Sequence, residues 1–441
     1  MRKALTIACA YLLTGALLLT ACSGGGNEAG SSGGGGNSSG GSASSSPTKL
    51  VFWTFNELHQ KFFEKMAANW NKAHSDMPIK LEATTFPYED THSKLLVALQ
   101  SGTGAPDLAD IEISKIGNFL KGEPQLVPLN DIVEPEKGNL VMSRLDNYAK
   151  DGNYYGIDYH VGAEVIYYNK EILDQAGVNP DDIKTWDDFE KAGKQVLDKT
   201  GKPMTTLETT DQWSFWPLVA QHGSDFLDKD GNVILNNAAN LEVLTYLQKL
   251  VKEKVAVLAP GGGHHAEEYY GMMNQGGAAA VWMPMWYMGR FTDYMPDLKG
   301  KIIIRPTPVF KEGEMRSSGM GGTGTVITNQ SKNKELAKKF LEYAKISKEG
   351  NIEIWRDLGF DPIRTDVWGD PAMKESNKFT DYFGDQIFED LLKLKDEIAP
   401  VNIKEKTPAV SDVVKTKVMF QALNDLKDPK QVLDDAAASI K

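Results

Sequence analysis

The chain has 441 residues, a formal net charge of −12 at pH 7 and two cysteines, Cys9 and Cys22. This negative balance argues against nucleic acid as a partner, because nucleic-acid recognition needs a basic face, and also against an electrostatic attraction to anionic lipids. The residues from Lys49 onward lack cysteine, which excludes disulfides, thiolate active sites and cysteine–zinc sites in that part of the chain. That part is also longer than one hydrophobic core usually spans, so we expect two domains.

The first 21 residues have the pattern of a secretory signal peptide. Two basic residues begin it, and an apolar run from Ala4 to Leu19 follows, which is shorter than the about 20 residues of a membrane span. The run Leu19-Thr-Ala-Cys22 resembles the lipobox of bacterial lipoproteins, in which the signal is cleaved before a cysteine that then carries lipid. An ordinary signal peptide with an incidental cysteine is the alternative. We predict a signal peptide over 1–21 and a lipidated Cys22.

A linker follows the predicted lipid site. Residues 23–47 are almost wholly Gly and Ser, a composition that cannot bury apolar surface and therefore stays disordered. A flexible chain of this length spans roughly 28 Å on average. We therefore assign residues 22–48 to the lipidated cysteine and a linker that lets the folded body move over a membrane and dock there.

The next part of the chain alternates between strand-like and helical spacing of its apolar residues. Three strands are predicted at 50–55, 79–86 and 106–111, and three helices at 57–74, 88–100 and 114–120. Because parallel strands need helical crossovers, this alternation predicts a doubly wound α/β domain.

Further elements follow in a less regular order. Strands are predicted at 154–158, 163–169, 278–283, 301–304 and 325–328. Helices are predicted at 212–221, 241–252, 269–273 and 333–346, and the last hundred residues read as mostly helical. Thr185, with Asp188 three residues later, predicts a capping box that starts a helix running to Leu197.

The run Gly319-Met-Gly-Gly-Thr-Gly324 fits the G-x-G-x-x-G pattern of dinucleotide sites. In such sites a strand precedes the glycines and a helix follows them, whereas here polar residues precede and the strand-like Thr325–Thr328 follows. Glycines also permit the large dihedral changes of a crossing between domains. We therefore favour a flexible crossing over a nucleotide site.

Aromatic and polar side chains gather next to predicted strand ends and turns. The aromatic candidates for ligand contact are Trp53, Trp213, Trp216, Trp282, Trp286 and Tyr287, and the polar candidates near the first strand are Asn56, Glu57 and His59. Ligands of open α/β sheets bind beyond the carboxyl ends of strands. Sugar rings offer C–H faces that aromatic rings cover and hydroxyls that mixed donors and acceptors match. Core packing is the alternative for any single tryptophan.

Several other polar residues follow strands and add candidates. Asp110 and Glu112 lie on one face of a short predicted strand, and Asp158 and His160 follow another strand. Arg364 lies in a later turn. Each of these residues could bind a ligand or belong to a structural hydrogen-bond network. Asp158 with Glu164 could form a glycosidase acid/base pair. His264 and His265 could suggest a metal, but adjacent histidines point apart and no H-E-x-x-H motif is present, so we predict no metal and no cofactor.

With its lipobox, linker and body together, the chain resembles the extracellular solute-binding lipoproteins of bacterial carbohydrate ABC importers. The body carries this similarity in Gly104-Ala-Pro-Asp107, Tyr154-Tyr-Gly156, Val165-Ile-Tyr-Tyr-Asn169 and Asn333-Lys-Glu-Leu-Ala-Lys-Lys-Phe-Leu341. Within that group, it is most similar to arabino-oligosaccharide-binding lipoproteins through Phe52-Trp-Thr-Phe-Asn56, Gly261-Gly-Gly-His-His265, Glu267-Glu-Tyr-Tyr-Gly271 and Trp286-Tyr-Met-Gly-Arg290.

The resemblance implies an α/β fold of the periplasmic-binding-protein type, with two lobes and a ligand cleft between them. It implies an N-terminal lobe of residues 49–161 plus 322–361 and a C-terminal lobe of residues 162–321 plus 362–441. Crossings would lie near 160–164, 318–324 and 360–364. In the cleft, Trp216, Trp282 and Trp286 would stack on sugar, and Glu57, Glu112 and Asp158 would bind hydroxyls.

The resemblance also implies how the protein works. It would be a monomer, anchored through lipid on the extracellular face of the cell membrane, that delivers an oligosaccharide to the permease subunits of an ABC transporter. Two other functions stay open at this point. One is a secreted glycoside hydrolase, which needs two carboxylates about 5–9 Å apart. The other is a sugar receptor for a membrane sensor kinase, which differs only in its partner.

Overall fold

The computed structural model describes residues 46–440. The predicted signal peptide 1–21, the predicted lipid site Cys22 and all but the end of the linker 22–48 lie outside the described residues. Within residues 46–440, no helix combines the length and the apolar character needed to cross a membrane.

The N-terminal lobe is built on a five-stranded sheet in the order β2-β1-β3-β13-β6. Its strands are β1 (Thr48–Thr54), β2 (Ile79–Thr85), β3 (Leu108–Glu112), β6 (Gly156–Asp158) and β13 (Thr323–Ile327). Strand β1 runs parallel to β2 and β3, but β13 runs antiparallel to β3 and β6. The predicted parallel pairing with helical crossovers is confirmed for β1, β2 and β3, and the sheet as a whole is mixed because a segment far along the chain inserts between β3 and β6.

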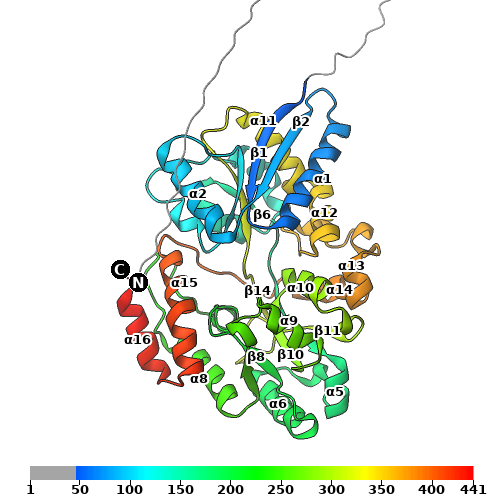
Figure 1. Cartoon of the computed structure of the whole chain (residues 1–441), viewed down its shortest axis with the longest axis vertical. Coiled ribbons are helices and arrows are strands. Elements are labelled where there is room, and N and C mark those ends of the chain that lie inside the picture. The colour runs from blue at the N-terminus through cyan, green and yellow to red at the C-terminus, as the bar shows by residue number, and fades with distance from the viewer. Residues whose placement is uncertain (1–45, 441) are drawn as a thin grey trace, which may run out of the picture. The chain divides into compact units, whose positions relative to one another are not determined.

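Helices pack around this sheet (Figure 1). They are α1 (Glu57–Ala73), α2 (Tyr88–Ser101), α11 (Lys334–Leu341) and α12 (Lys348–Leu358), with the short α3 (Asn130–Val133) and α4 (Met142–Leu145). Asn56 caps α1 by accepting a hydrogen bond from the amide of Leu58, and α1 buries Phe62, Phe63 and Trp70. This cap fixes the turn between β1 and α1, from which several cleft residues project.

The C-terminal lobe is built on the antiparallel sheet β10-β7-β11. Its strands are β7 (Glu164–Asn169), β10 (Ala280–Pro284) and β11 (Ile302–Pro306), and a parallel pair, β8 (Thr205–Leu207) with β9 (Ala256–Leu258), lies next to it. Surrounding helices are α5 (Lys170–Ala176), α6 (Trp186–Thr200), α7 (Trp216–Gln221), α8 (Ala238–Lys252), α9 (Glu267–Asn274) and α10 (Met288–Tyr294). The predicted capping box of Thr185 and Asp188 is confirmed at the start of α6.

The C-terminal region is mostly helical, as predicted. It contains α13 (Lys378–Phe383), α14 (Ile387–Leu394), α15 (Thr407–Val413) and α16 (Pro429–Ser439). The predicted helix 114–120 is wrong, since only a 3₁₀ turn, Ile116–Asn118, forms there. The predicted strand 154–158 is broken at Tyr155 into β5 (Asn153–Tyr154), which pairs with β4 (Ala149–Lys150), and β6. Strands as short as β8 and β9 contain too few residues for a period of apolar side chains to be recognised in the sequence.

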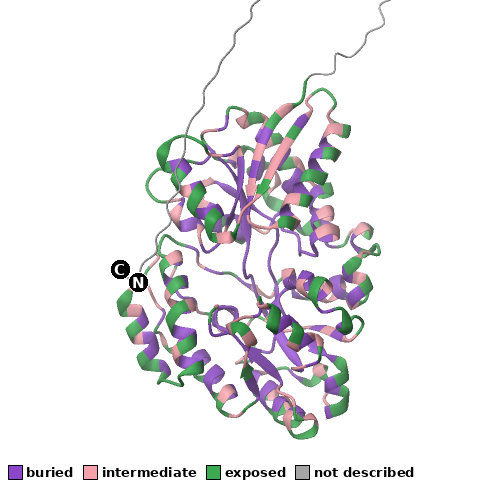
Figure 2. Cartoon of the chain, in the orientation of Figure 1, coloured by how far each residue is buried: buried purple, intermediate pink, exposed green. Residues whose placement is uncertain are grey.

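Three stretches carry the chain between the two sheets. They connect β6 to β7, β12 (Ser317–Ser318) to β13, and α12 to residue 364. The first and third are joined directly, because the carboxylate of Asp361 accepts hydrogen bonds from the amides of Gly162 and Ala163. These crossings and the inner strands of the sheets are largely buried, whereas the edge strand β2 is mostly of intermediate burial (Figure 2). The lobe boundaries given above stay a prediction.

The glycine-rich run 319–324 forms part of the second crossing. Gly321 and Gly322 have φ values of 67° and 140°, a backbone region that favours glycine. A Cβ at Gly322 would also lie 2.4–2.5 Å from the side chains of Arg144 and Asp158. Strand β13 follows directly, so the chain continues as a strand where a dinucleotide fold would begin a helix.

Candidate functional site

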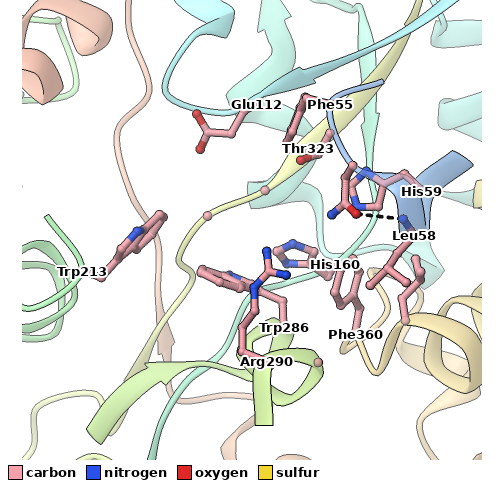
Figure 3. A pocket seen from close by; sticks show the side chains of 15 residues that line it. Phe55, Leu58, His59, Glu112, His160, Trp213, Trp286, Arg290, Thr323 and Phe360 are labelled. Carbon is pink, nitrogen blue, oxygen red and sulfur yellow. Dashed lines mark hydrogen bonds between the residues drawn. The ribbon is translucent and has the colours of Figure 1, made fainter. Parts of the chain in front are cut away.

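A cavity of about 150 Å³ lies where the two lobes and the crossings meet (Figure 3). It brings together the predicted residues Asn56, His59, Glu112, His160, Trp213 and Trp286. It is also lined by residues that were not among the predicted site residues, namely Phe55, Leu58, Gly289, Arg290, Gly321, Gly322, Thr323, Leu358 and Phe360. Both lobes therefore contribute to one site.

Two tryptophans of the C-terminal lobe form an aromatic wall of the cavity. The rings of Trp213 and Trp286 meet edge to face, with centroids 5.3 Å apart. His265 stacks on Trp286 at 5.7 Å, and the indole N–H of Trp286 donates to the backbone carbonyl of Met320 at 3.1 Å. These contacts hold the indole rings in place, and such fixed aromatic faces suit the C–H face of a sugar ring.

Glu112 supplies a fixed hydrogen-bond acceptor from the N-terminal lobe. Its Oε2 accepts from the Tyr88 hydroxyl at 3.0 Å and from the amide and hydroxyl of Ser114, which leaves Oε1 without a hydrogen-bond partner among the described residues. Burial raises the pKa of Glu112, although Lys415 and the bonds from Ser114 oppose the rise. In Figure 3 its carboxylate points into the space above the two tryptophans. Glu112 is thus placed to bind a ligand hydroxyl.

Asp110 does not line the cavity but orients His59, which does. Its carboxylate lies 3.0 Å from His59 Nδ1 and accepts from the hydroxyls of Thr54 at 2.8 Å and Thr325 at 2.7 Å. Burial alone would raise the pKa of Asp110, but the His59 contact, the Lys345 charge and the Thr325 bond together hold that pKa below its usual value. A carboxylate next to Nδ1 of a histidine favours the tautomer that carries the proton on Nδ1, and the other ring nitrogen, Nε2, can then accept a hydrogen bond.

His160 and Arg290 complete the polar lining. Burial lowers the pKa of His160 to about 3, so its ring is neutral, and its Nδ1 has no hydrogen-bond partner in the described part of the chain. The guanidinium of Arg290 makes no hydrogen bond or ion pair with any described residue and extends from α10 beside Trp286 (Figure 3). Its spacing of four residues from Trp286 is the signal that could have identified it, because such residues share a helix face.

Several predicted site residues lie elsewhere. The predicted residues that do not line the cavity are Trp53, Glu57, Asp110, Asp158, Trp216, Trp282, Tyr287 and Arg364. Trp282, on β10, is fully buried and packs against Trp186 at 5.2 Å. Trp216 stacks on Phe226 and donates its indole N–H to Asp225 at 2.8 Å. These tryptophans belong to the core of the C-terminal lobe because their ring faces are covered by neighbouring apolar side chains.

The polar residues outside the cavity have structural partners. Asp158 pairs with Arg144 at 2.9 Å and accepts from the Thr323 amide. Arg364 pairs with Asp366 at 2.7 Å and with Glu136 at 2.8 Å. The Tyr287 hydroxyl donates to the carbonyl of His264, Trp53 packs edge to face with Phe86, and Glu57 is exposed in the first turn of α1.

Neither the carboxylate pair Asp158 and Glu164 nor the histidine pair His264 and His265 lines the cavity. Of the described residues that line the cavity, Glu112 is the only carboxylate, whereas glycoside hydrolysis uses two that flank one bond. Glu164 lies outside the cavity and is 1% exposed. His264 Nε2 contacts the Thr206 hydroxyl at 2.9 Å, while His265 faces Trp286. Residues 46–440 contain no cluster of three potential metal ligands.

Comparison with known proteins places this chain in a family. A family model for bacterial extracellular solute-binding proteins matches residues 56–349. The chain is 51% identical over 398 residues to the arabinooligosaccharide-binding protein of Bacillus subtilis, covering 89% of this chain and 92% of the relative. It is 50% identical over 396 residues to the arabinooligosaccharide-binding protein of Halalkalibacterium halodurans, covering 89% of each.

The fold has matches among solved structures as well. The GacH receptor of Streptomyces glaucescens, determined unliganded and with acarbose, matches with a TM-score of 0.73 over 89% of this chain and 97% of that chain. The identity is 19%, so this likeness concerns the two-lobed fold. With the family match, the two relatives and the shared fold taken together, this chain belongs to the bacterial extracellular solute-binding proteins.

Proposed function

We propose that this protein is a receptor for arabino-oligosaccharides that delivers them to an ABC importer. The observation that carries the proposal is the 51% identity, over 89% of the chain, to a protein named for binding these sugars. The cavity supports a sugar ligand, since Trp213 and Trp286 offer aromatic faces and Glu112 and His59 offer hydroxyl acceptors. We further propose that it acts as a monomer.

Binding is proposed to be coupled to movement of the lobes. The cavity of about 150 Å³ is smaller than the about 300–1,000 Å³ typical of ligand pockets, so the lobes must separate for an oligosaccharide to enter. The crossings provide the hinge, and a ligand that contacts both lobes favours the closed form through those added contacts. The closed form is the one proposed to dock on the permease.

The protein is proposed to bind its sugar without cleaving it. This agrees with a cavity in which Glu112 is the only carboxylate among the described lining residues, because the hydrolase alternative needs a second one across the scissile bond. Incubation of the purified protein with arabino-oligosaccharides and chromatography of the products distinguishes the two functions, since shortened chains would support the hydrolase.

Ligand class is tested by a thermal-shift panel of arabino-, malto-, xylo- and galacto-oligosaccharides. We expect arabino-oligosaccharides to stabilise the protein, because a ligand that binds only the native state adds about 2.7 kcal/mol at a hundredfold excess over Kd. The other sugars serve as controls of similar size and polarity. A shift with one of them and none with arabino-oligosaccharides would refute the proposed ligand and leave the fold assignment intact.

The protein is also proposed to be lipid-anchored on the outside of the cell through Cys22. Replacing Cys22 with alanine is expected to release the protein into the medium, because the acylated thiol is lost, while sugar affinity stays unchanged. Cell fractionation followed by binding assays on the released protein measures both outcomes. The anchor proposal fails if the variant stays in the membrane fraction to the same extent as the parent.

A further inference from the structure

A stacked tyrosine pair lies on the C-terminal lobe next to the cavity. Tyr270 of α9 and Tyr294 of α10 lie face to face, with centroids 4.6 Å apart and planes at 5°. Tyr294 is 49% exposed, whereas Tyr270 is 8% exposed. One face of the Tyr294 ring is therefore covered and held by Tyr270, which leaves an ordered aromatic surface open to solvent.

This pair continues the wall of the cavity along one helix face. Trp286 and Arg290, both in the cavity lining, and Tyr294 follow each other at intervals of four residues, and the turn Met285–Tyr287 leads directly into α10. Side chains four residues apart share a face and are separated by about 6 Å along the axis. Burial raises the pKa of the Tyr270 phenol while the nearby Arg290 charge lowers it, which places the guanidinium close to the pair.

The elements that carry the pair face the other lobe. Helices α9 and α10 lie on the side of the C-terminal lobe that is turned toward the N-terminal lobe (Figure 1). One row along α10 thus contains the exposed face of Tyr294, the guanidinium of Arg290, which has no hydrogen-bond or ion-pair partner among the described residues, and the cavity edge at Trp286. A free aromatic face next to unpaired donors has the same chemistry as the central wall formed by Trp213 and Trp286.

We propose that Tyr294, backed by Tyr270 and flanked by Arg290, forms a rim subsite that binds an additional sugar residue of longer oligosaccharides. The subsite rests on the proposed sugar-binding function and extends it, because it makes affinity depend on chain length. Of the row Trp286, Arg290 and Tyr294, sugars short enough to fit in the central cavity contact only the first two. Longer chains continue over α10 and place a ring on the exposed face of Tyr294.

The test is the affinity of the full chain for a series of arabino-oligosaccharides from the disaccharide upward, measured by calorimetry. Tyr294→Ala is expected to leave the Kd of the shortest sugar unchanged and to weaken binding of the longer ones about five- to tenfold, the scale of one aromatic stacking contact. Tyr294→Phe is expected to restore parental affinity, because the contact needs the ring and not the hydroxyl. Phe420→Ala, which also removes a partly exposed aromatic ring (44%) outside the cavity lining, is the matched control.

The outcomes separate this inference from the proposed function. A variant-to-parent ratio of Kd that rises with chain length supports the subsite, whereas a ratio equal at all lengths overturns it. If the parent binds malto-oligosaccharides and no arabino-oligosaccharide, the ligand proposal fails, and the same ratio measured over the malto series still decides the subsite. Melting of each variant without sugar verifies that the exposed substitutions leave the fold intact.

Discussion

Replacing Trp286 with alanine is expected to weaken oligosaccharide binding by about 2–4 kcal/mol, as for an aromatic contact at the centre of an interface. The indole lies on the cavity wall against Trp213 and His265 and is only partly buried. Its removal takes away a stacking surface that the ligand would cover. Melting of the sugar-free variant is expected to change much less than binding, and calorimetry with thermal denaturation measures both quantities.

Trp282→Ala is the matched control for that variant. Trp282 is fully buried against Trp186 and Phe189 and does not line the cavity. Truncation of a buried tryptophan leaves a void and costs about 3–5 kcal/mol of stability. We therefore expect Trp282→Ala to lower the melting temperature of the sugar-free protein strongly. The opposite pattern, with Trp286→Ala unstable and binding unimpaired, would show that Trp286 serves the core.

Glu164→Gln is expected to stabilise the protein at neutral pH. Glu164 is 1% exposed, both of its carboxylate oxygens lack a hydrogen-bond partner within residues 46–440, and burial together with the charge of Glu208 raises its pKa well above the usual value. Such a group holds a proton in the folded state that it releases in the unfolded state. Stability therefore falls as the pH rises above the unfolded-state value of about 4.3, by up to about 1.4 kcal/mol per pH unit.

The variant removes this dependence because glutamine stays neutral and keeps the shape of the protonated acid. The gain in unfolding free energy is expected to be smallest at pH 5 and to grow as the pH rises to 7, with the slope given above as its upper limit. Buried histidines act in the opposite direction. Burial lowers the pKa of His160 and His264 to about 3 each, so they reduce stability as the pH falls below about 6.5.

The measurement is therefore the difference in unfolding free energy between variant and parent, obtained by denaturant unfolding at several pH values. The histidine contributions cancel in this difference. Glu123→Gln, at an exposed position, is the control and is expected to give a difference near zero throughout. A difference for Glu164→Gln that does not grow with pH would mean that Glu164 is ionised in the folded protein, with a compensating partner.

Most long elements of the fold were predictable from sequence. The helix 57–74 and the strands 79–86 and 163–169 appear within one residue of their expected bounds as α1, β2 and β7. The apolar residues of α1 repeat with a helical period, those of β2 alternate with polar ones, and β7 is a short run that is buried throughout. Asn56 and Thr185 cap the helices α1 and α6. The predicted helix 114–120 failed because a short apolar cluster fits a turn and a helix equally well.

The candidate site was predictable only in part. The turn after β1 and the strand around Asp110 were identified, and Asn56, His59 and Glu112 line the cavity. The sequence does not distinguish Trp213 and Trp286 from Trp216 and Trp282, because all four lie beside turns or strand ends with similar neighbours. A cavity residue differs from a core residue in which side chains cover it, and those contacts join segments that are distant in the sequence.

The sequence by itself indicated the class of protein through its resemblance to solute-binding lipoproteins, and it predicted most of the order of the elements because periodicity and capping are local properties of the chain. Only the tertiary structure decided that β13 enters the first sheet antiparallel, next to β3, and that Asp110 orients His59 instead of lining the cavity. It also decided that Tyr270 of α9 stacks on Tyr294 of α10. These are relations between segments up to hundreds of residues apart, and packing and hydrogen bonding across that separation fix them.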